Sequence, residues 1–359
     1  MEKAYLVLSN GMVFEGERLG SRTDSTGELV FTTGMCGYIE TLTDPSYAGQ
    51  IVMQTFPLIG NYGIIEEDFE GACAVRGYVV RECCTEPSNF RCDYDLDTFL
   101  KKRGVPGICG VDTRYITKII RSEGVMNACI CSAVPESLDG LRAYAVRGAV
   151  PRVTCRERYT LPALGERRFS VALIDYGAKR SIALELQKRG CEVTVFPGTA
   201  TASEILDADP DGIMLSNGPG DPAENKFCIA QLRRIIGKRP VFGICLGHQL
   251  AALAMDGETV KLKYGHRGAN QPVRDLTSGR TYITSQNHGY AVVSGSLRGA
   301  GRVIFENAND GTCEGVEYPG KMCFTVQFHP EARSGPHDTL FLFDRFIRMM
   351  EGGKSDAER

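Results

Sequence analysis

The sequence predicts an α/β protein of two domains, in which an N-terminal α+β domain precedes a doubly wound, mostly parallel sheet. Three observations lead to this prediction. A chain of 359 residues is too long for one ordinary core. Short β-like runs separated by turn signals fill its first 150 residues, and apolar strands alternate with helical segments after residue 168. A sheet of the second kind holds its ligands at the carboxyl ends of its strands.

Charge and hydropathy exclude several classes of protein. The formal net charge is −3 and no basic stripe stands out, which argues against a nucleic-acid partner. No run approaches the roughly 18 consecutive apolar residues of a membrane span. Met1 leads directly into the strand-like residues 4–8, without a signal peptide or a transit sequence. We therefore expect a cytoplasmic protein with no membrane contact.

The chain contains fourteen cysteines and five histidines. The pair Cys83-Cys84 and the run Cys129-Ile130-Cys131 lack the spacing of a zinc or disulfide motif. We expect no metal site, and we expect thirteen of the cysteines to be reduced structural residues. Cys245 is the exception.

Residues 1–150 form the predicted α+β domain. Its β-like runs are residues 6–8, 12–14, 29–31, 51–55 and 78–81, and Ser9-Asn10-Gly11 suits a hairpin turn. Helical patterns over residues 96–103 and 113–122 are each stopped by a glycine. Nothing in this half pairs a nucleophile with a nearby base, and the polar peptide 41–50 taken alone is a turn that leads into a strand.

The second half begins after a polar, arginine-rich passage, residues 151–168, which we predict to be a linker. Apolar strands alternate with helices in the domain that we predict over residues 169–350. Its expected strands are residues 169–174, 192–196, 212–215 and 240–244, and its expected helices are residues 180–189, 202–208 and 225–236. Further β-like runs are residues 259–263, 281–285, 291–293 and 323–327, before a final amphipathic helix over residues 339–350. Residues 351–359 are predicted to be a disordered tail.

The most informative stretch is Val241-Phe242-Gly243-Ile244-Cys245-Leu246-Gly247-His248-Gln249. An apolar strand meets a glycine-flanked turn with Cys245 at its apex, and a helix-forming run follows at once. This is the frame of a nucleophile elbow, where the two glycines remove the Cβ atoms that would collide between strand and helix. The helix N-terminus beside the sulfur favours the thiolate. A cysteine in another setting would more often be a small core residue, but this frame favours the nucleophile.

A cysteine nucleophile needs a base, and the base needs an orienting group. His329 and Glu331 follow a β-like run with one residue between them, so in extended backbone they point the same way. We therefore predict His329 as the base and Glu331 as the residue that orients it. The other histidines are weaker candidates; His248, in the first turn of the elbow helix, is expected to face away from the sulfur.

Acyl transfer also needs an oxyanion hole. The strand at residues 212–215 ends in Ser216-Asn217-Gly218-Pro219-Gly220-Asp221-Pro222, whose glycines let backbone N–H groups approach a ligand. The amide of Leu246 is the expected second donor. A phosphate loop is excluded, because no lysine and Ser/Thr follow in the required frame.

The elbow together with His329-Pro330-Glu331 resembles the class I, or triad, glutamine amidotransferases, which hydrolyse the side-chain amide of glutamine through a cysteinyl thioester. The first domain narrows the resemblance to the small subunit of carbamoyl phosphate synthetase, over about residues 3–350. The stretches that carry this resemblance are residues 33–38, 43–47, 59–63, 79–82, 111–114, 175–179 and 335–338. Two departures are small: Tyr290 stands where phenylalanine is expected, and Ile64-Ile65 where an asparagine is usual.

The resemblance implies a role for each matching position. Cys245 would be the nucleophile, with His329 as general base and then acid and Glu331 as its orienting partner. Gly220 and Leu246 would supply oxyanion amides. The residues that would contact glutamine are Ser46, reaching across from the first domain, and Gly218, Gln249, Asn287, Gly289 and Tyr290.

The implied function is that of a glutaminase subunit. Ammonia would pass inside the protein to a separate large subunit, which would make carbamoyl phosphate from bicarbonate and ATP for pyrimidine and arginine synthesis. This chain would hold no cofactor, and ATP with its divalent cation would bind the partner. A free-standing glutaminase and an amidotransferase that serves another synthase are disfavoured alternatives, because they leave the N-terminal domain unexplained. A catalytically silent regulatory subunit is the third alternative, and the presence of Cys245, His329 and Glu331 together argues against it.

Overall fold

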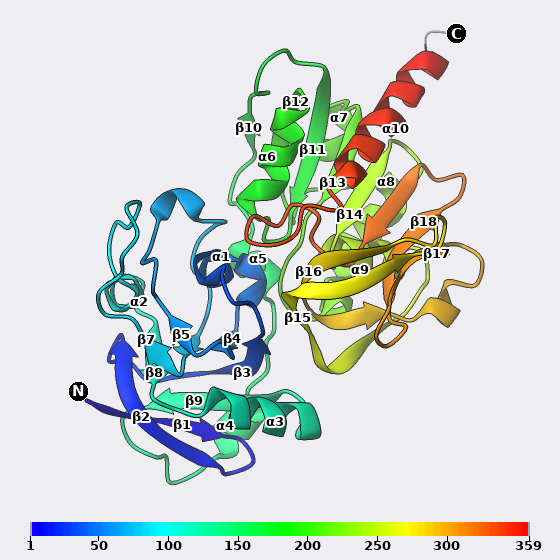
Figure 1. The fold of residues 1–359 in the computed structure, drawn as a ribbon. Helices are drawn as coiled ribbons and strands as arrows, with labels where there is room; N and C mark the ends of the chain where they lie inside the picture. The colour runs from blue at the N-terminus through cyan, green and yellow to red at the C-terminus, as the bar shows by residue number, and fades with distance from the viewer. Residues whose placement is uncertain (1, 358–359) are drawn as a thin grey trace. The chain divides into compact units, whose positions relative to one another are not determined.

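The structure is a computed structural model that describes the backbone of residues 2–357 and the side chains of residues 2–352. The chain divides into two compact units, the first ending at Arg147 and the second beginning at Gly148. Figure 1 shows the elements of both units.

Seven strands of the first unit close into a barrel in the order β1-β2-β8-β6-β4-β3-β9. They are β1 (Lys3–Leu8), β2 (Val13–Gly20), β3 (Ser25–Thr32), β4 (Gln50–Gln54), β6 (Gly77–Val79), β8 (Pro106–Cys109) and β9 (Met126–Cys131). The predicted hairpin at Ser9-Asn10-Gly11 joins β1 to β2, with Val7 opposite Val13. The barrel closes because β9 pairs with both β1 and β3, so that Ile130 lies opposite Leu6 on one side and Ser25 on the other.

Both helices expected in the first unit are present as α2 (Leu96–Lys102) and α3 (Thr113–Glu123). Their N-termini are capped by Asp95 and Asp112, whose side chains accept hydrogen bonds from backbone N–H groups. The smaller elements of the unit are α1 (Tyr38–Thr43), α4 (Asp139–Ala143), the 3₁₀ turns η1 (Pro45–Tyr47) and η2 (Glu66–Asp68), and the paired strands β5 (Leu58–Ile59) and β7 (Glu82–Cys83).

The second unit is built on a ten-stranded sheet in the order β10-β12-β11-β13-β14-β19-β18-β16-β15-β17. The five strands from β12 to β19 in this order are parallel. The strand at one edge and the four at the other pair antiparallel. The doubly wound parallel sheet predicted from the sequence is therefore the centre of a larger mixed sheet.

The strands of this sheet are β10 (Tyr159–Leu161), β11 (Phe169–Asp175), β12 (Cys191–Pro197), β13 (Gly212–Leu215), β14 (Val241–Ile244), β15 (Thr259–Asp275), β16 (Thr281–Val292), β17 (Arg302–Asn307), β18 (Cys313–Tyr318) and β19 (Cys323–Val326). The runs expected at residues 259–263, 281–285 and 291–293 are parts of the two long strands β15 and β16. The register of this pair shifts between Lys261 and His266 and again between Gly268 and Gln271.

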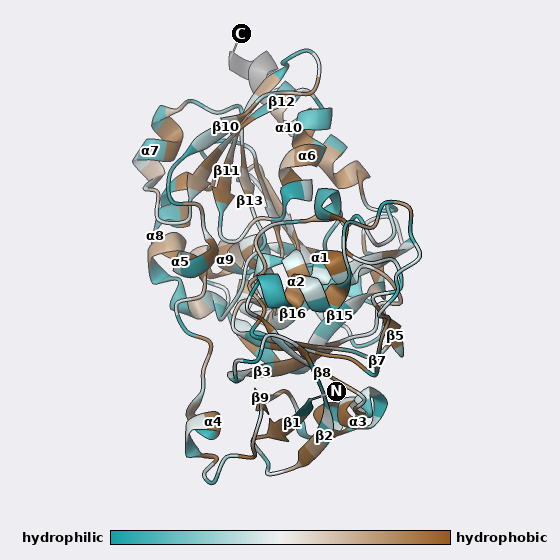
Figure 2. Ribbon diagram, turned by 90° about the vertical axis from the view of Figure 1, so that its left-hand side faces the viewer, coloured by the Kyte–Doolittle hydropathy of each residue, from teal (hydrophilic) through white to brown (hydrophobic). Residues whose placement is uncertain are grey.

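Helices cover both faces of the parallel strands. The helices are α5 (Val150–Val153), α6 (Arg180–Lys188), α7 (Ala202–Asp207), α8 (Lys226–Ile235), α9 (Leu246–Ala254) and α10 (Phe341–Ala357), with the 3₁₀ turns η3 (Pro222–Glu224) and η4 (Ser294–Leu297). Ile205, Leu232 and Leu250 place α7, α8 and α9 in one buried cluster, while Leu186 and Phe346 place α6 and α10 in the other. Figure 2 shows brown and teal residues on the same helix in α6 and α7, as expected for helices with one buried side.

Two boundaries differ from the prediction. The passage 151–168, expected to be a linker, contributes the edge strand β10 to the second unit, with Tyr159 opposite Val195. Its polar composition reflects the solvent exposure of an edge strand. Helix α10 continues to Ala357, into the segment 351–359 expected to be a disordered tail, and Arg168 holds Glu351 through a 2.7 Å hydrogen bond. Residues 358–359 lie outside the described part of the chain.

Across residues 2–357 no helix has both the length and the apolar character needed to cross a membrane.

Candidate active site

Cys245 lies where β14 ends and α9 begins, at the carboxyl edge of the parallel strands. Its backbone adopts φ 53° and ψ −104°, a conformation that a residue with a Cβ atom rarely occupies. Its N–H donates to the carbonyl oxygen of Val326 in β19 (2.8 Å), and its thiol donates to that of Asn287 in β16 (3.6 Å). The structure therefore contains the strained elbow that the sequence predicts.

Gly247 makes this turn possible. A Cβ atom at residue 247 would lie 2.6 Å from both the carbonyl oxygen and the Cβ of Leu215 in β13. The N–H of Gly247 donates to the carbonyl oxygen of Ser216 over 3.0 Å, which ties the first turn of α9 to the strand beside it. Any side chain here would push the helix, and the nucleophile with it, away from the sheet.

His329 and Glu331 follow β19 and are both buried. Nδ1 of His329 lies 2.7 Å from Oε1 of Glu331, which confirms the predicted contact of base and carboxylate. The His329 N–H donates to the carbonyl oxygen of Ser285 over 2.9 Å and anchors this segment to β16. Nε2 of His329, the nitrogen remote from Glu331, makes no conventional hydrogen bond within the described residues and is the one available to a reacting group.

Lys179 joins this network, although the sequence analysis assigned it no role. Its Nζ donates to Oε1 of Glu331 over 3.1 Å, from the residue that precedes α6. The Lys179 N–H donates to Oδ1 of Asn217 over 3.0 Å, which fixes the backbone of the lysine against the Gly218–Gly220 loop. Its position just past the carboxyl end of β11, within the stretch 175–179 that carries the family resemblance, is the signal that could have identified it.

The charges in this network set its protonation. Burial opposes ionisation of Glu331, but Lys179 and His329 outweigh it and lower the pKa of the carboxyl to about 2. Burial and Lys179 lower the pKa of His329, whereas Glu331 and the Cys245 side chain raise it, with a net rise to about 9. His329 is therefore protonated at neutral pH and can donate a proton to a leaving group.

Of the two predicted oxyanion residues, Leu246 belongs to the elbow and Gly220 to the loop after β13. A Cβ atom at Gly218 would lie 2.3 Å from the carbonyl oxygen of Tyr176 and 2.7 Å from Cδ2 of Leu246, so this loop and the start of α9 are in close contact. Gly220 has φ 86°. Leu246 is the first residue of α9, where a helix leaves the backbone N–H without a partner from its own turns.

Three of the predicted glutamine contacts lie on β16, close to the nucleophile. Asn287 accepts the hydrogen bond of the Cys245 thiol, and Gly289 and Tyr290 follow it on the strand. Gln249 of α9 donates through Nε2 to the carbonyl oxygen of Tyr290 (2.8 Å) and to Oε1 of Gln327 (2.9 Å). Both amide protons of Gln249 are thus used within the protein, which leaves its carbonyl oxygen for a ligand.

Ser46 belongs to the first unit, where its N–H donates to Oδ1 of Asp44 over 2.9 Å in the turn η1. Its contact with glutamine stays a prediction, as do the ligand contacts of the other residues.

His248 is not an alternative base. It is fully buried, and its Nδ1 lies 2.8 Å from Oγ1 of Thr325. Burial lowers the pKa of His248 to about 3, so the ring stays neutral and serves the packing of α9 against β19.

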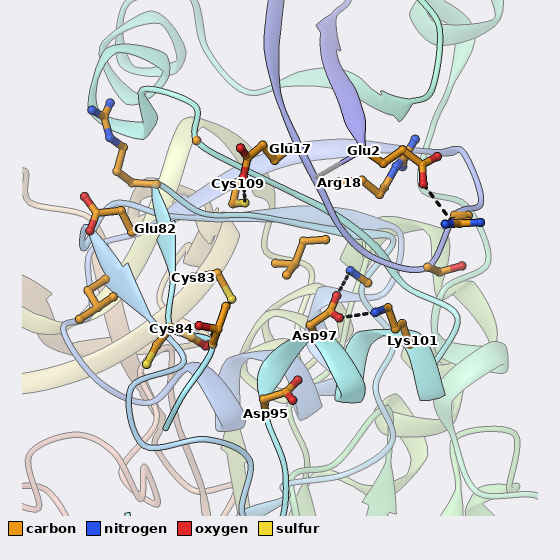
Figure 3. Close-up of a pocket in the computed structure, with 18 residues that line it drawn as sticks. Glu2, Glu17, Arg18, Glu82, Cys83, Cys84, Asp95, Asp97, Lys101 and Cys109 are labelled. Atoms are coloured by element: carbon orange, nitrogen blue, oxygen red, sulfur yellow. Dashed lines mark hydrogen bonds and ion pairs between the residues drawn. The ribbon is translucent and has the colours of Figure 1, made fainter. Parts of the chain in front are cut away.

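The first unit contains a cavity of about 1080 Å³, lined in part by Glu17, Cys83, Asp97 and Cys109 (Figure 3). Burial raises the pKa of Cys83 to about 12, and burial together with Glu17 raises that of Cys109. Asp97 accepts a 2.7 Å hydrogen bond from the Gly20 N–H and also pairs with a lysine. The raised pKa values of Cys83 and Cys109 favour their protonated thiols.

Comparison with known proteins accounts for both units. Residues 6–130 match the family described as carbamoyl-phosphate synthase small chain, CPSase domain, and residues 172–349 match glutamine amidotransferase class-I. A carbamoyl phosphate synthase small chain from Bacillus caldolyticus is 50% identical over 354 residues, which cover 97% of this chain and 96% of the relative. The chain belongs to the carbamoyl phosphate synthase small-chain family.

Other members of the small-chain family agree in length as well as sequence. The small chain of Clostridium perfringens is 49% identical over 350 residues, which cover 96% of this chain and 99% of that one. The small chain of Listeria monocytogenes is 49% identical over 364 residues, which cover 100% of this chain and 99% of that one. The family and the activity predicted from the sequence, a glutamine-hydrolysing small subunit of carbamoyl phosphate synthetase, are confirmed.

Proposed function

We propose that Cys245, His329 and Glu331 hydrolyse L-glutamine, and that the ammonia passes to a large synthetase subunit. The observation that carries this proposal is the buried network in which Lys179 and His329 share Oε1 of Glu331, next to a cysteine in a strained elbow. A cysteine that only packed the core would need neither the strain nor the charges.

In the first half-reaction, the Cys245 thiolate attacks the side-chain amide carbon of glutamine. The C–N bond breaks as a C–S bond forms, and the protonated His329 gives its proton to the departing nitrogen, which leaves as ammonia. The backbone N–H groups of Gly220 and Leu246 would hold the oxygen that carries negative charge. Losing one such donor typically costs about 3–4 kcal/mol of transition-state stabilisation.

In the second half-reaction, the now neutral His329 takes a proton from water while the water oxygen attacks the thioester. The C–S bond breaks, glutamate leaves, and the thiolate and protonated imidazole are restored. Glu331 keeps Nδ1 of His329 protonated through both steps, so that Nε2 alone exchanges protons. Lys179 balances the charge of Glu331 while His329 is neutral.

We extend the proposal to the residues that contact glutamine, to the partner subunit and to the cellular compartment. Ser46, Gly218, Gln249, Asn287, Gly289 and Tyr290 would hold the glutamine. The hydrolysis needs no cofactor on this chain, whereas the large subunit would bind ATP with its divalent cation and use bicarbonate. The assembly would be cytoplasmic and serve arginine synthesis, pyrimidine synthesis or both.

The test is Cys245→Ser in the assembled enzyme. Glutamine-dependent carbamoyl phosphate synthesis should be lost, while synthesis from free ammonia continues. Cys228→Ser is the matched control, since Cys228 is also buried and donates to a backbone carbonyl oxygen, that of Gly198, over 3.3 Å. Loss of both activities in Cys245→Ser would contradict the proposal.

The alternatives predict other outcomes. A silent regulatory subunit would bind the partner but release no glutamate from glutamine. A free glutaminase, or an amidotransferase for another synthase, would release glutamate without yielding carbamoyl phosphate. Capture of the chain with its partner, followed by assay with glutamine, bicarbonate and ATP, separates these cases.

A further inference from the structure

A second group of buried ionisable side chains lies in the antiparallel part of the sheet in the second unit. It consists of His266 on β15, His288 on β16 and Glu314 on β18, which we call the β15/β16/β18 cluster. His288 and Glu314 are buried and the His266 side chain is 12% exposed, and one ligand atom from each lies within 4.8 Å of the other two. His266 and His288 face each other directly across the β15–β16 pair.

One nitrogen of each imidazole ring faces a hydrogen-bond acceptor outside the cluster. Nε2 of His266 lies 2.9 Å from Oδ2 of Asp310, and Nδ1 of His288 lies 2.8 Å from the carbonyl oxygen of Tyr290. Since both of these neighbours are acceptors, the nitrogens that face them carry the protons. The opposite nitrogens therefore present lone pairs in the neutral rings, and they lie 3.5 Å and 3.9 Å from Oε1 of Glu314. Nε2 of His288 also lies 3.1 Å from Oε1 of Gln286, a further oxygen that could approach a cation held there.

Glu314 and His266 make few hydrogen bonds with the atoms that face the cluster. Glu314 is fully buried, and its Oε2 has no hydrogen-bond partner among the described residues; neither has Nδ1 of His266. Oε1 of Glu314 accepts one long hydrogen bond, 3.3 Å, from Nδ2 of Asn307. A buried carboxylate facing two imidazole lone pairs is unfavourable unless a cation or a proton lies between them.

We propose that His266 Nδ1, His288 Nε2 and the Glu314 carboxylate together bind one Zn²⁺ ion. Two imidazoles and one carboxylate are a donor set that zinc uses, commonly with a water as fourth ligand. The hydrogen bonds of the remote nitrogens to Asp310 and to the Tyr290 carbonyl are the outer contacts that accompany metal-binding histidines. The spacing in the sequence gives no sign of this site, because its members come from three strands that only the folded sheet brings together.

The ion would have a structural rather than a catalytic role. It would tie β15, β16 and β18 together at His288, which is the neighbour of Asn287, the acceptor of the Cys245 thiol. The site would thereby fix the part of β16 that flanks the nucleophile. The competing arrangement is a protonated His266 that donates to Glu314 with no metal present.

Metal titration of the full-length chain decides between these two. Cys245→Ser should be used as the background, so that the catalytic thiol cannot act as a ligand. After removal of metal with a chelator, Co²⁺ is added as a visible probe and displaced with Zn²⁺. We expect one ion per chain and cobalt d–d absorption without a sulfur-to-metal charge-transfer band, since the site contains no cysteine.

Variants locate the ion. Glu314→Gln and His266→Gln should each weaken binding by about 100-fold or more, and Asp310→Asn, which removes only an outer contact, by about 10–100-fold. Glu306→Gln on β17 and His337→Gln, an exposed histidine, are matched controls that should bind normally. Asp310 is about half exposed, so its variant stays informative if the buried variants fail to fold.

Three results would overturn the proposal: no stoichiometric binding, a sulfur charge-transfer band that accounts for the bound cobalt, or binding unchanged in Glu314→Gln and Asp310→Asn. Saturating Zn²⁺ at about a hundredfold excess over its Kd should also raise the melting temperature by roughly 5–10 °C. That shift should be absent in Glu314→Gln.

Discussion

Two buried groups of histidine and glutamate lie in the same sheet, and they differ in what balances the carboxylate. Beside the nucleophile, Glu331 accepts from both Lys179 and His329, and its pKa falls to about 2. In the β15/β16/β18 cluster the ion-pair partners of Glu314 are imidazoles, and burial raises its pKa although His266 opposes the rise.

This difference indicates that one neighbouring cation determines whether a buried carboxylate stays ionised. With a lysine in place, the carboxylate is a permanent anion that can hold a histidine in one orientation through a reaction. At Glu314 the ion pairs are with imidazoles alone, although the buried Arg267 acts on His288, so a metal ion or a proton can supply the charge that Lys179 supplies to Glu331. The following predictions test this contrast, from the largest expected effect to the smallest.

The first prediction concerns His329. His329→Asn should lower kcat for glutamine hydrolysis by about 10²–10⁴-fold, because no other group then moves the proton to and from Nε2. KM for glutamine should change little, and synthesis from free ammonia by the assembled enzyme should continue. Steady-state glutamate release measures the effect, and His337→Asn serves as the control. A variant that keeps more than a tenth of the activity would remove His329 from the mechanism.

The second prediction concerns the cation. Lys179→Met keeps the aliphatic stem but leaves Glu331 buried without its balancing charge, which should destabilise the protein by about 3–5 kcal/mol. Urea unfolding measures this. Lys188→Met removes a half-exposed lysine from Glu185, which Arg189 still holds, and should cost less than about 1 kcal/mol.

A positioning role for Lys179 predicts more than lost stability. Lys179→Arg should recover most of the stability, whereas Lys179→Met should also shift the pH profile of kcat, since removing the lysine raises the pKa of both Glu331 and His329. An unshifted profile would reduce Lys179 to a purely structural residue.

The third prediction concerns pH. The pKa of His329 is raised from 6.5 to about 9, so its contribution to stability is fully present below pH 6.5 and is lost as pH rises through about 9. The loss should be about 3 kcal/mol, measured as the free energy of unfolding at pH 6 and at pH 9.5. Glu331, with its lowered pKa, contributes above pH 4.5 and loses that contribution only as pH falls towards 2. The alkaline decline should flatten in His329→Asn, and an equal decline there would show that other groups cause it.

The fourth prediction contrasts the two carboxylates directly. Because the pKa of Glu314 is raised, ionising it disfavours folding as pH rises above 4.5. Metal-free Glu314→Gln should therefore be as stable at pH 8 as the parent chain, or more stable by up to about 1 kcal/mol. Glu331→Gln should be less stable than the parent. The same sign of change in both variants would mean that the two sites do not differ in charge balance.

The sequence was sufficient for those features that local residues determine. The glycines at 243 and 247 identify the elbow, and the spacing of His329 and Glu331 places two side chains on one side of an extended segment. The alternation of strands and helices likewise predicts the central parallel sheet. The hairpin at Ser9-Asn10-Gly11 follows from its turn residues.

What the sequence could not give depends on contacts between distant segments. Closure of the barrel rests on pairs such as Leu6 with Ile130, whose partners no local pattern connects. In the sequence, Lys179 is only a lysine that follows a strand. Its role becomes visible because the fold places Glu331 beside it. His266, His288 and Glu314 come together only because β15 and β16 form one long irregular pair with β18 beside it, and the shifts in register hide that pair from a search for alternation.

The backbone of Cys245 has a consequence for how this protein evolves. At φ 53° and ψ −104° the residue costs the native state about 1–3 kcal/mol, which glycine would largely avoid. A Cys245→Gly chain should accordingly resist urea better than Cys245→Ser, although neither can react. Mutations of Cys245 that stabilise the chain therefore remove the thiol. Only selection for the release of ammonia from glutamine keeps the cysteine.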